Sequence, residues 1–391
     1  MTLNWSGKRR WIALVLVLAS LVVMFNWPPV VPVIQLPGEI YPAGEVFGLP
    51  ITNTFVGSMV VWIVILLLIR VVSGRRPRDG GEVPRGGFYN FFEMAFEGLY
   101  GFIGGIAPER YLGPIFKMFM TIFILVLLSN WLHLIPGIDS IGFLHPHVHK
   151  VEGHYELLDG FDLATLGGVH YLNGQCPWVS PEAVATMSDE ALQARADAGC
   201  LSGIPAAEAA DDHADEAADD DHGEEIDYHH LEPGDPAVPW VILPYVRVPS
   251  TDLNMTLAFA LIAVVMIQVM GFRALGISYL TKFFNFSTLF KSPLGGIDVA
   301  VGLLELIGEM AKILSFAFRL LGSMFAGSIL LFVISFLLPV IAPWPVFLLE
   351  FFVGLIQAIV FGLLTAIFMS LATVSHHHDE EHHEEAAAGA H

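Results

Sequence analysis

The sequence is poor in charge and almost devoid of cysteine. Only 15% of its 391 residues are Asp, Glu, Lys or Arg, whereas 54% are hydrophobic. A soluble domain of this length needs a larger polar surface, so the composition excludes an ordinary soluble protein. The two cysteines, Cys176 and Cys200, are too few for a convincing metal motif. Whether they pair as a disulfide depends on whether their loop faces an oxidising compartment.

Two further absences narrow the function. No GxxxxGK[ST] phosphate-binding loop occurs, so nucleotide chemistry belongs to partners, and we expect no catalytic site and no cofactor in this chain. The chain has 18 Lys and Arg against 39 Asp and Glu, a formal net charge of −21. Nucleic-acid binding requires a basic surface, and this balance argues against it.

What the sequence does have is a set of long apolar runs. A helix needs about 20 apolar residues to cross a bilayer, and no run alternates with a period of two, which favours helices over transmembrane strands. We predict an all-α membrane protein with a bundle of five to six transmembrane helices, including two long, tilted helices at the C-terminal end. The runs lie at about 11–27, 54–72, 115–135, 255–272, 297–338 and 344–374.

The runs and the polar stretches between them divide the chain into five parts. The first run has the basic start and apolar middle of a signal peptide, but no clean cleavage site follows, which favours an uncleaved anchor. Aromatic, Gly-rich residues 86–106 suit either an interfacial helix, which we favour, or a re-entrant piece. Low-complexity residues 206–227 are predicted to be disordered. The parts are 1–50 (first span and external linker), 51–137 (early spans and interfacial helix), 138–245 (acidic, His-rich insertion), 246–374 (C-terminal spans) and 375–391 (His- and Glu-rich tail).

Basic residues give the chain an orientation. Clusters at 8–10, 75–78 and 273–291 fall at alternate span ends, and Lys and Arg accumulate on the cytoplasmic side of membrane proteins. The acidic insertion 138–245 is then external and the C-terminal tail cytoplasmic. We expect a multi-pass protein of a bacterial plasma (inner) membrane.

The fifth run carries a polar stripe. At about 100° per residue, one stripe about 80° wide holds Glu305, Glu309, Lys312, Arg319 and Ser323. Glu309 and Lys312 are three residues apart and can neutralise each other. Arg319 has no acid three or four residues away, and its guanidinium stays charged. Its partner is therefore either Glu350 of this chain, fixing the packing, or a mobile carboxylate of another subunit, which we favour.

Polar residues of the other spans suggest a path for protons. Glu350 and Gln357 lie seven residues apart on one helix face, where a carboxyl group can take up and release protons. Asp252 and Asn254 mark the external end of the fourth run, where Asp252 is either a helix N-cap or a channel-mouth acid. The external histidines His145, His147 and His149 are weak candidates for a metal site; an acidic loop that buffers protons is the favoured interpretation.

Four stretches of the chain carry a resemblance to a known family. They are SNWLHLIPG at 129–137, VPSTDLNMTLA at 248–258, ELIGEMAKILSFAFRLLGSMFAGSILL at 305–331 and the pattern around Glu350 and Gln357 in the sixth run. Together they resemble subunit a of the F-type ATP synthase. The resemblance covers about 50–137 and 240–374. It implies a non-catalytic component of a proton-transporting two-sector ATPase, in which 246–374 form two half-channels leading to a c-ring whose subunits each carry a carboxylate. It also implies contact with the b subunits of the peripheral stalk and with lipid.

The resemblance assigns roles to individual residues. Arg319 matches the family's essential arginine, Glu305 its cytoplasmic half-channel acid, and Gln357 the glutamine that faces the arginine. Ser323 stands where asparagine is usual, and Ser328 stands where a titratable Glu or His is common. The external route would accordingly rely on Glu350 and water instead of a two-residue relay.

Two other functions compete with this interpretation. A secondary metal-ion transporter would explain the His-rich external loop, but its ligands should lie inside facing spans, where His133 is the only histidine. The spans also show no inverted repeat. A passive anchor for the external insertion would leave the polar stripe unexplained.

Overall fold

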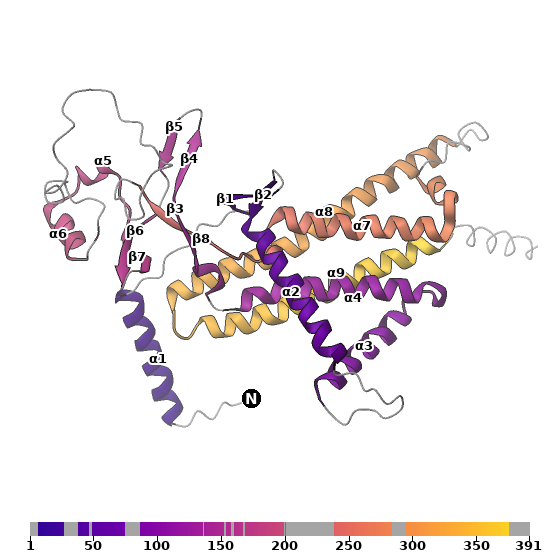
Figure 1. The fold of residues 1–391 in the computed structure, drawn as a ribbon, viewed down its shortest axis with the longest axis horizontal. Coiled ribbons are helices and arrows are strands. Elements are labelled where there is room, and N and C mark those ends of the chain that lie inside the picture. Colours follow the sequence, from indigo (N-terminus) through magenta and orange to yellow (C-terminus); the bar gives the residue numbers. More distant parts are fainter. Residues whose placement is uncertain are drawn as a thin grey trace, which may run out of the picture. The chain divides into compact units, whose positions relative to one another are not determined.

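The structure is a computed structural model, and Figure 1 shows its fold. It describes residues 7–26, 38–46, 49–74, 87–135, 137–151, 154–157, 160–166, 169–198, 200, 238–283 and 295–374. Five helices of this described part are long and apolar enough to cross a membrane, which confirms the predicted helical bundle. The stretch 206–227 that we predicted to be disordered and the tail 375–391 lie outside the described residues.

The five long helices follow the apolar runs closely. They are α2 (Asn53–Gly74), α4 (Leu112–Trp131), α7 (Leu253–Leu275), α8 (Gly295–Leu337) and α9 (Pro343–Thr373). Proline sets the break between the last two, because α8 ends two residues before Pro339 and α9 begins on Pro343. Proline lacks the N–H that a helix interior needs but is tolerated in the first turn.

Two further helices form from the first run and from residues 86–106, whose roles the sequence left open. The first run forms α1 (Gly7–Asn26), whose apolar stretch Leu14–Met24 is shorter than a full span. Residues predicted to be interfacial form α3 (Phe88–Gly104), a helix of 17 residues. Its Phe91, Met94 and Phe102 side chains are exposed. The interfacial position of α3 and the anchoring role of α1 stay predictions.

The chain divides into two compact units. The second unit comprises Leu36–Pro136, Val246–Gly327 and Leu348–His391, and it contains the apolar core of the membrane helices. Phe119 of α4, Ile267 of α7, Phe316 of α8 and Phe361 of α9 are all nearly inaccessible to solvent within one cluster. Four helices that are far apart in sequence therefore share one core.

Close backbone contacts hold α2 in this unit. A side chain at Gly57 would collide with the carbonyl oxygen of Arg247, so only glycine fits there. The Arg247 N–H donates to the Asn53 carbonyl oxygen at 3.4 Å. A short hairpin of β1 (Ile40–Val46) and β2 (Leu49–Thr52) precedes the helix. The start of α2 is thus fixed against the segment that leads into α7.

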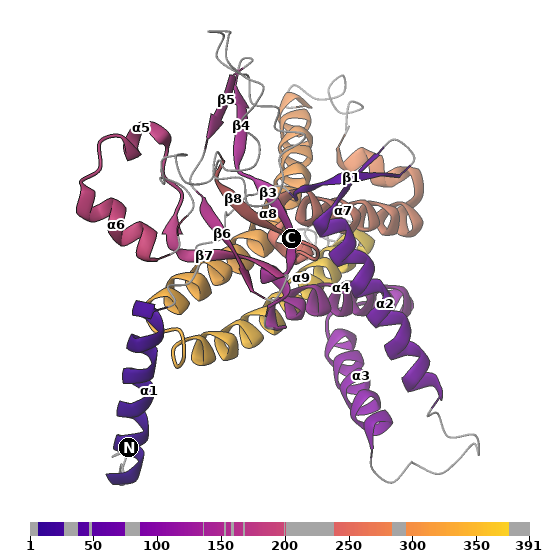
Figure 2. The same ribbon diagram turned by 60° about the vertical axis from the view of Figure 1, so that its left-hand side comes forward.

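The first unit comprises Met1–Gln35, Gly137–Tyr245 and Ser328–Phe347. Its insertion contains strands that the sequence did not predict, and Figure 2 shows them beside two short helices. An antiparallel sheet has the order β3-β8-β6-β7, and β4 pairs with β5. The elements are β3 (Gly142–Pro146), β4 (Val148–Val151), β5 (His154–Leu157), β6 (Phe161–Leu166), β7 (Val169–Pro177), α5 (Pro181–Val184), α6 (Asp189–Asp197) and β8 (Trp240–Pro244).

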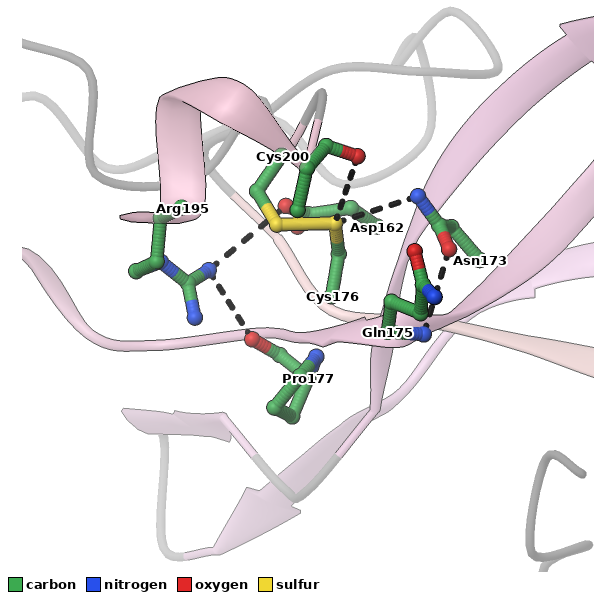
Figure 3. The surroundings of a disulfide bond; sticks show 8 residues. Asp162, Asn173, Gln175, Cys176, Pro177, Arg195 and Cys200 are labelled. Atoms are coloured by element: carbon green, nitrogen blue, oxygen red, sulfur yellow. Dashed lines mark hydrogen bonds and ion pairs between the residues drawn. A yellow bond between two sulfur atoms is a disulfide. The ribbon is translucent and has the colours of Figure 1, made fainter. Parts of the chain in front are cut away.

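A disulfide ties this insertion together. Cys176 at the end of β7 is bonded to Cys200 after α6 (Figure 3), so the pairing that the sequence left open is present. Beside it, the Arg195 guanidinium lies 3.7 Å from the buried Asp162 carboxylate and donates to the Pro177 carbonyl oxygen. The buried charge of Asp162 therefore has a cationic partner, as burial requires.

Candidate ion-translocation site

Arg319 lies within the long helix α8 and has no acidic partner among the described residues. Its side chain is half-buried, and one guanidinium nitrogen donates to the Ser315 hydroxyl at 3.3 Å. The other terminal nitrogen is buried without a hydrogen bond in the described part of the chain. No ion pair joins Arg319 to Glu350 there, so the fixed pair that we considered from the sequence does not form. The guanidinium keeps most of its hydrogen-bonding capacity unused.

Unlike Arg319, the acid Glu309 of the polar stripe has a partner of opposite charge among the described residues. Glu309 is buried and its carboxylate pairs with the Lys312 ammonium at 2.7 Å, as the spacing predicted. Its other oxygen accepts from the Gln268 amide of α7 at 2.9 Å. Gln268 in turn accepts from the Tyr279 hydroxyl at 2.8 Å. This network fastens α8 to α7 about two to three turns before Arg319, while Glu305 lies half-buried further toward the helix start.

Glu350 of α9 occupies a tight, buried pocket. Its side chain is 5% exposed, and one carboxylate oxygen lies 3.3 Å from Nε2 of His133, which is also buried. A Cβ added at Gly327 of α8 would lie 3.0 Å from the other oxygen, closer than most Cβ contacts, so the glycine leaves room for the carboxylate. Three chain segments, around His133, Gly327 and Glu350, therefore surround one carboxylate.

The segment that carries His133 is locked to α9 by its neighbours. The Asn130 amide donates to the Gly354 carbonyl oxygen at 3.1 Å, and the Trp131 indole donates to that of Phe351 at 3.2 Å. The rings of Trp131 and Phe351 also stack, with centroids 4.7 Å apart. Because α4 continues through a 3₁₀ turn at Leu132–Leu134, His133 is held rigidly against α9.

The C-terminal half of the chain is similar to known proteins. The family model described as ATP synthase A chain matches residues 201–370. The chain is 32% identical over 133 residues to an ATP synthase subunit a of Campylobacter jejuni subsp. doylei, covering 34% of this chain and 56% of that protein. Over this part, the chain is similar to ATP synthase subunit a.

Two further relatives show similar identity and coverage. The subunit a of Moorella thermoacetica is 33% identical over 132 residues, covering 34% of this chain and 55% of the relative. That of Aliivibrio fischeri is 35% identical over 147 residues, covering 35% and 52%. The chain thus spans about half the length of the curated relatives it matches. It is a multi-pass membrane protein of the helical kind expected for an ATP synthase a subunit.

The remaining candidates lie within the matched range but do not all meet. Ser323 donates to the carbonyl oxygens of Arg319 and Leu320 within α8. Gln357 is half-buried, and no hydrogen bond joins it to Arg319 in the described residues. Ser328 is half-buried and belongs to the first unit. The position opposite Arg319 that the resemblance gives Gln357 stays a prediction.

Asp252 acts as a helix cap. One carboxylate oxygen accepts from the Asn254 N–H at 2.8 Å, and the other accepts from the Thr54 hydroxyl of α2 at 2.6 Å. The side chain is 2% exposed, whereas Asn254 is exposed. Of the two interpretations that the sequence left open for Asp252, the N-cap is the one with observed contacts.

The histidines of the insertion are spread over separate elements. His145 lies on β3, His147 follows it, and His149 is on β4 opposite Glu156 of β5. The cluster with metal-binding distances that is found there is Asp162, Cys176 and Cys200. Its two sulfur atoms are bonded to each other, and a disulfide sulfur is not the thiolate that binds metals.

Sequence reasoning missed the pairing of His133 with Glu350. The sequence places His133 at membrane depth near the end of a span, and this position does not indicate that the side chain contacts α9. The usable signal was the motif SNWLHLIPG itself, where Asn130 and His133 are three residues apart and therefore share a helix face.

Proposed function

We propose that this chain is the ion-translocating stator subunit of an F-type ATP synthase in a bacterial plasma membrane. In this role it forms two aqueous half-channels to the carboxylates of a c-ring, works alongside b subunits of a peripheral stalk, and couples proton flow to rotation and ATP synthesis. The observation that carries the proposal is the Arg319 guanidinium, whose contacts among the described residues are a neutral hydroxyl and no carboxylate.

The charge of Arg319 suits a passing anion. At about 4 Å and an effective dielectric constant of 20, a carboxylate is attracted by about 4 kcal/mol. This favours the ionised form of each ring carboxylate, and the attraction is weak enough to be broken as the ring turns. A permanent cation between the half-channels also repels protons that would otherwise pass directly. Lysine is a poorer choice because it can lose its proton and lacks the planar fork.

Acids on either side of Arg319 would complete the path. Glu305 is the candidate for the cytoplasmic half-channel, and Glu350 is the candidate for the external one. The orientation that places the insertion 138–245 outside and the tail 375–391 inside rests on the positions of the basic residues. The metal-transporter alternative lacks a ligand cluster at membrane depth among the described residues.

The test replaces Arg319 in the intact complex. Arg319→Ala and Arg319→Lys should abolish both ATP-driven proton pumping and gradient-driven ATP synthesis in inverted vesicles, while the complex still assembles. Arg273→Ala removes an exposed arginine at the end of α7 and is the matched control that should keep both activities. Coupled synthesis at the wild-type rate in Arg319→Ala would refute the proposal.

Orientation is tested separately. A protease added to inverted vesicles should remove an epitope fused after residue 391 and leave the insertion 138–245 intact. The same protease added to spheroplasts should give the opposite result. Cleavage of the insertion in inverted vesicles would reverse the assigned topology.

A further inference from the structure

We propose that His133 is the proton-exchanging partner of Glu350, so that the external route has a two-residue relay built from α4 and α9. This proposal rests on the proposed function and corrects its sequence-based version, in which Glu350 worked with water alone. The starting observation is the 3.3 Å separation between His133 Nε2 and a Glu350 carboxylate oxygen.

Both side chains of the pair are buried, and the Glu350 carboxylate needs a polar partner there. His133 and Glu350 are 4% and 5% exposed, and neither carboxylate oxygen of Glu350 has a hydrogen bond among the described residues. A buried carboxylate that lacks hydrogen bonds is costly unless it is paired or neutralised by a proton. At 3.3 Å the imidazole is close enough to serve either purpose, because it holds a proton or accepts one near neutral pH.

Polar atoms continue beyond the pair. The Ser129 hydroxyl and the Asn130 amide oxygen are both buried without hydrogen bonds in the described part. Buried polar atoms of this kind are normally satisfied by internal water. Ser129 and Asn130 lie within four residues of His133, so the end of α4 carries several buried polar atoms beside the residue that contacts Glu350.

The rigid surroundings favour exchange over a mere packing role. Hydrogen bonds from Asn130 and Trp131 to α9 already join the two segments without using His133 or Glu350. A structural brace would not require two ionisable groups whose alignment leaves the carboxylate without a hydrogen bond.

The proton step balances simply. An imidazolium at His133 gives its Nε2 proton to the Glu350 carboxylate, leaving a neutral imidazole and a neutral carboxylic acid. Glu350 then releases the same proton toward the c-ring carboxylate and regains its charge, while His133 takes a new proton from the external side. In the synthesis direction every proton that leaves Glu350 is replaced through His133.

The experiment measures coupled proton transport per assembled complex in membrane vesicles between pH 6 and 9. His133→Gln keeps a polar side chain but cannot carry a proton, and it should lower the rate at least tenfold and flatten its pH dependence. His170→Gln, which replaces an exposed histidine of the insertion, is the matched control and should change neither. A wild-type rate and pH profile in His133→Gln would overturn the relay.

A swapped variant covers the case in which His133→Gln fails to assemble. His133→Glu with Glu350→His retains one imidazole and one carboxyl group in the same pocket. Recovery of at least a third of the wild-type rate supports exchange between the groups, whereas a rate as low as in Glu350→Gln refutes it. Arg319→Ala distinguishes the two proposals: if it abolishes coupling while His133→Gln is fully active, the relay fails and the stator function stands.

Discussion

The Thr54 hydroxyl of α2 donates a 2.6 Å hydrogen bond to Asp252, the residue that caps α7. The two residues are 198 positions apart in sequence, and both are buried. A single carboxylate therefore fixes the starts of two transmembrane helices relative to each other.

Asp252 should matter for stability more than for transport. Asp252→Ala removes a cap worth about 0.5–2 kcal/mol and leaves Thr54 without its acceptor, so we expect less assembled complex and a lower temperature of aggregation in detergent. Asp252→Asn retains an acceptor oxygen and should be milder. Transport normalised to assembled complex should stay near wild type in both. A normal yield with a tenfold loss of transport would instead favour the channel-mouth role.

Lys312→Met should weaken the attachment of α8 to α7. It leaves the buried Glu309 carboxylate with the hydrogen bond from Gln268 and without its cation, and breaking a buried pair costs about 3–5 kcal/mol. Because Lys312 is a quarter exposed, the lower end is expected. Thermal unfolding in detergent measures the loss, with the exposed Lys117→Met as control. Adding Glu309→Gln should restore much of the stability; no recovery would show that the ion pair is not the cause.

Gly354→Ala should separate α4 from α9. The added methyl group would lie 3.1 Å from the Asn130 Cβ and 3.4 Å from the Trp131 ring, and overpacking of this kind costs about 1–3 kcal/mol. The matched control is Gly98→Ala of α3, where a methyl group meets no atom within 4 Å and alanine favours the helix. We expect a lower thermal midpoint in the first variant only, as measured on the detergent-extracted complex.

Removal of the disulfide should loosen the insertion. Cys176 and Cys200 are 24 residues apart, and a cross-link over a loop of this length contributes about 3 kcal/mol in the chain-entropy model. Cys176→Ser with Cys200→Ser should increase cleavage of the insertion by protease added to the detergent-extracted complex. Dithiothreitol should have the same effect on the wild type and none on the double variant. Equal protease resistance of all samples would show that the bond is dispensable.

The sequence predicted the membrane helices well because their signal is local. The polar stripe on α8, the Glu309–Lys312 pair and the helix break near Pro339 all depend on residues within a few positions of one another. The partner of Glu350 could not be found in this way, since His133 reaches it only through the packing of α4 against α9. The strands of the insertion were missed because short β pairings such as β6 with β8 join distant segments and carry little periodic signal.

The Gln268–Glu309–Lys312 network would also hold α8 in place against a force applied to Arg319. If each ring carboxylate pulls on Arg319, the guanidinium is pulled back with equal force, and that load passes into α8. If α8 were free to slide along its neighbours, this force would displace α8 instead of turning the ring. In the proposed function, the bond between Glu309 and Gln268 of α7, within three turns of Arg319, would carry the reaction force into the bundle core and leave the torque on the rotor.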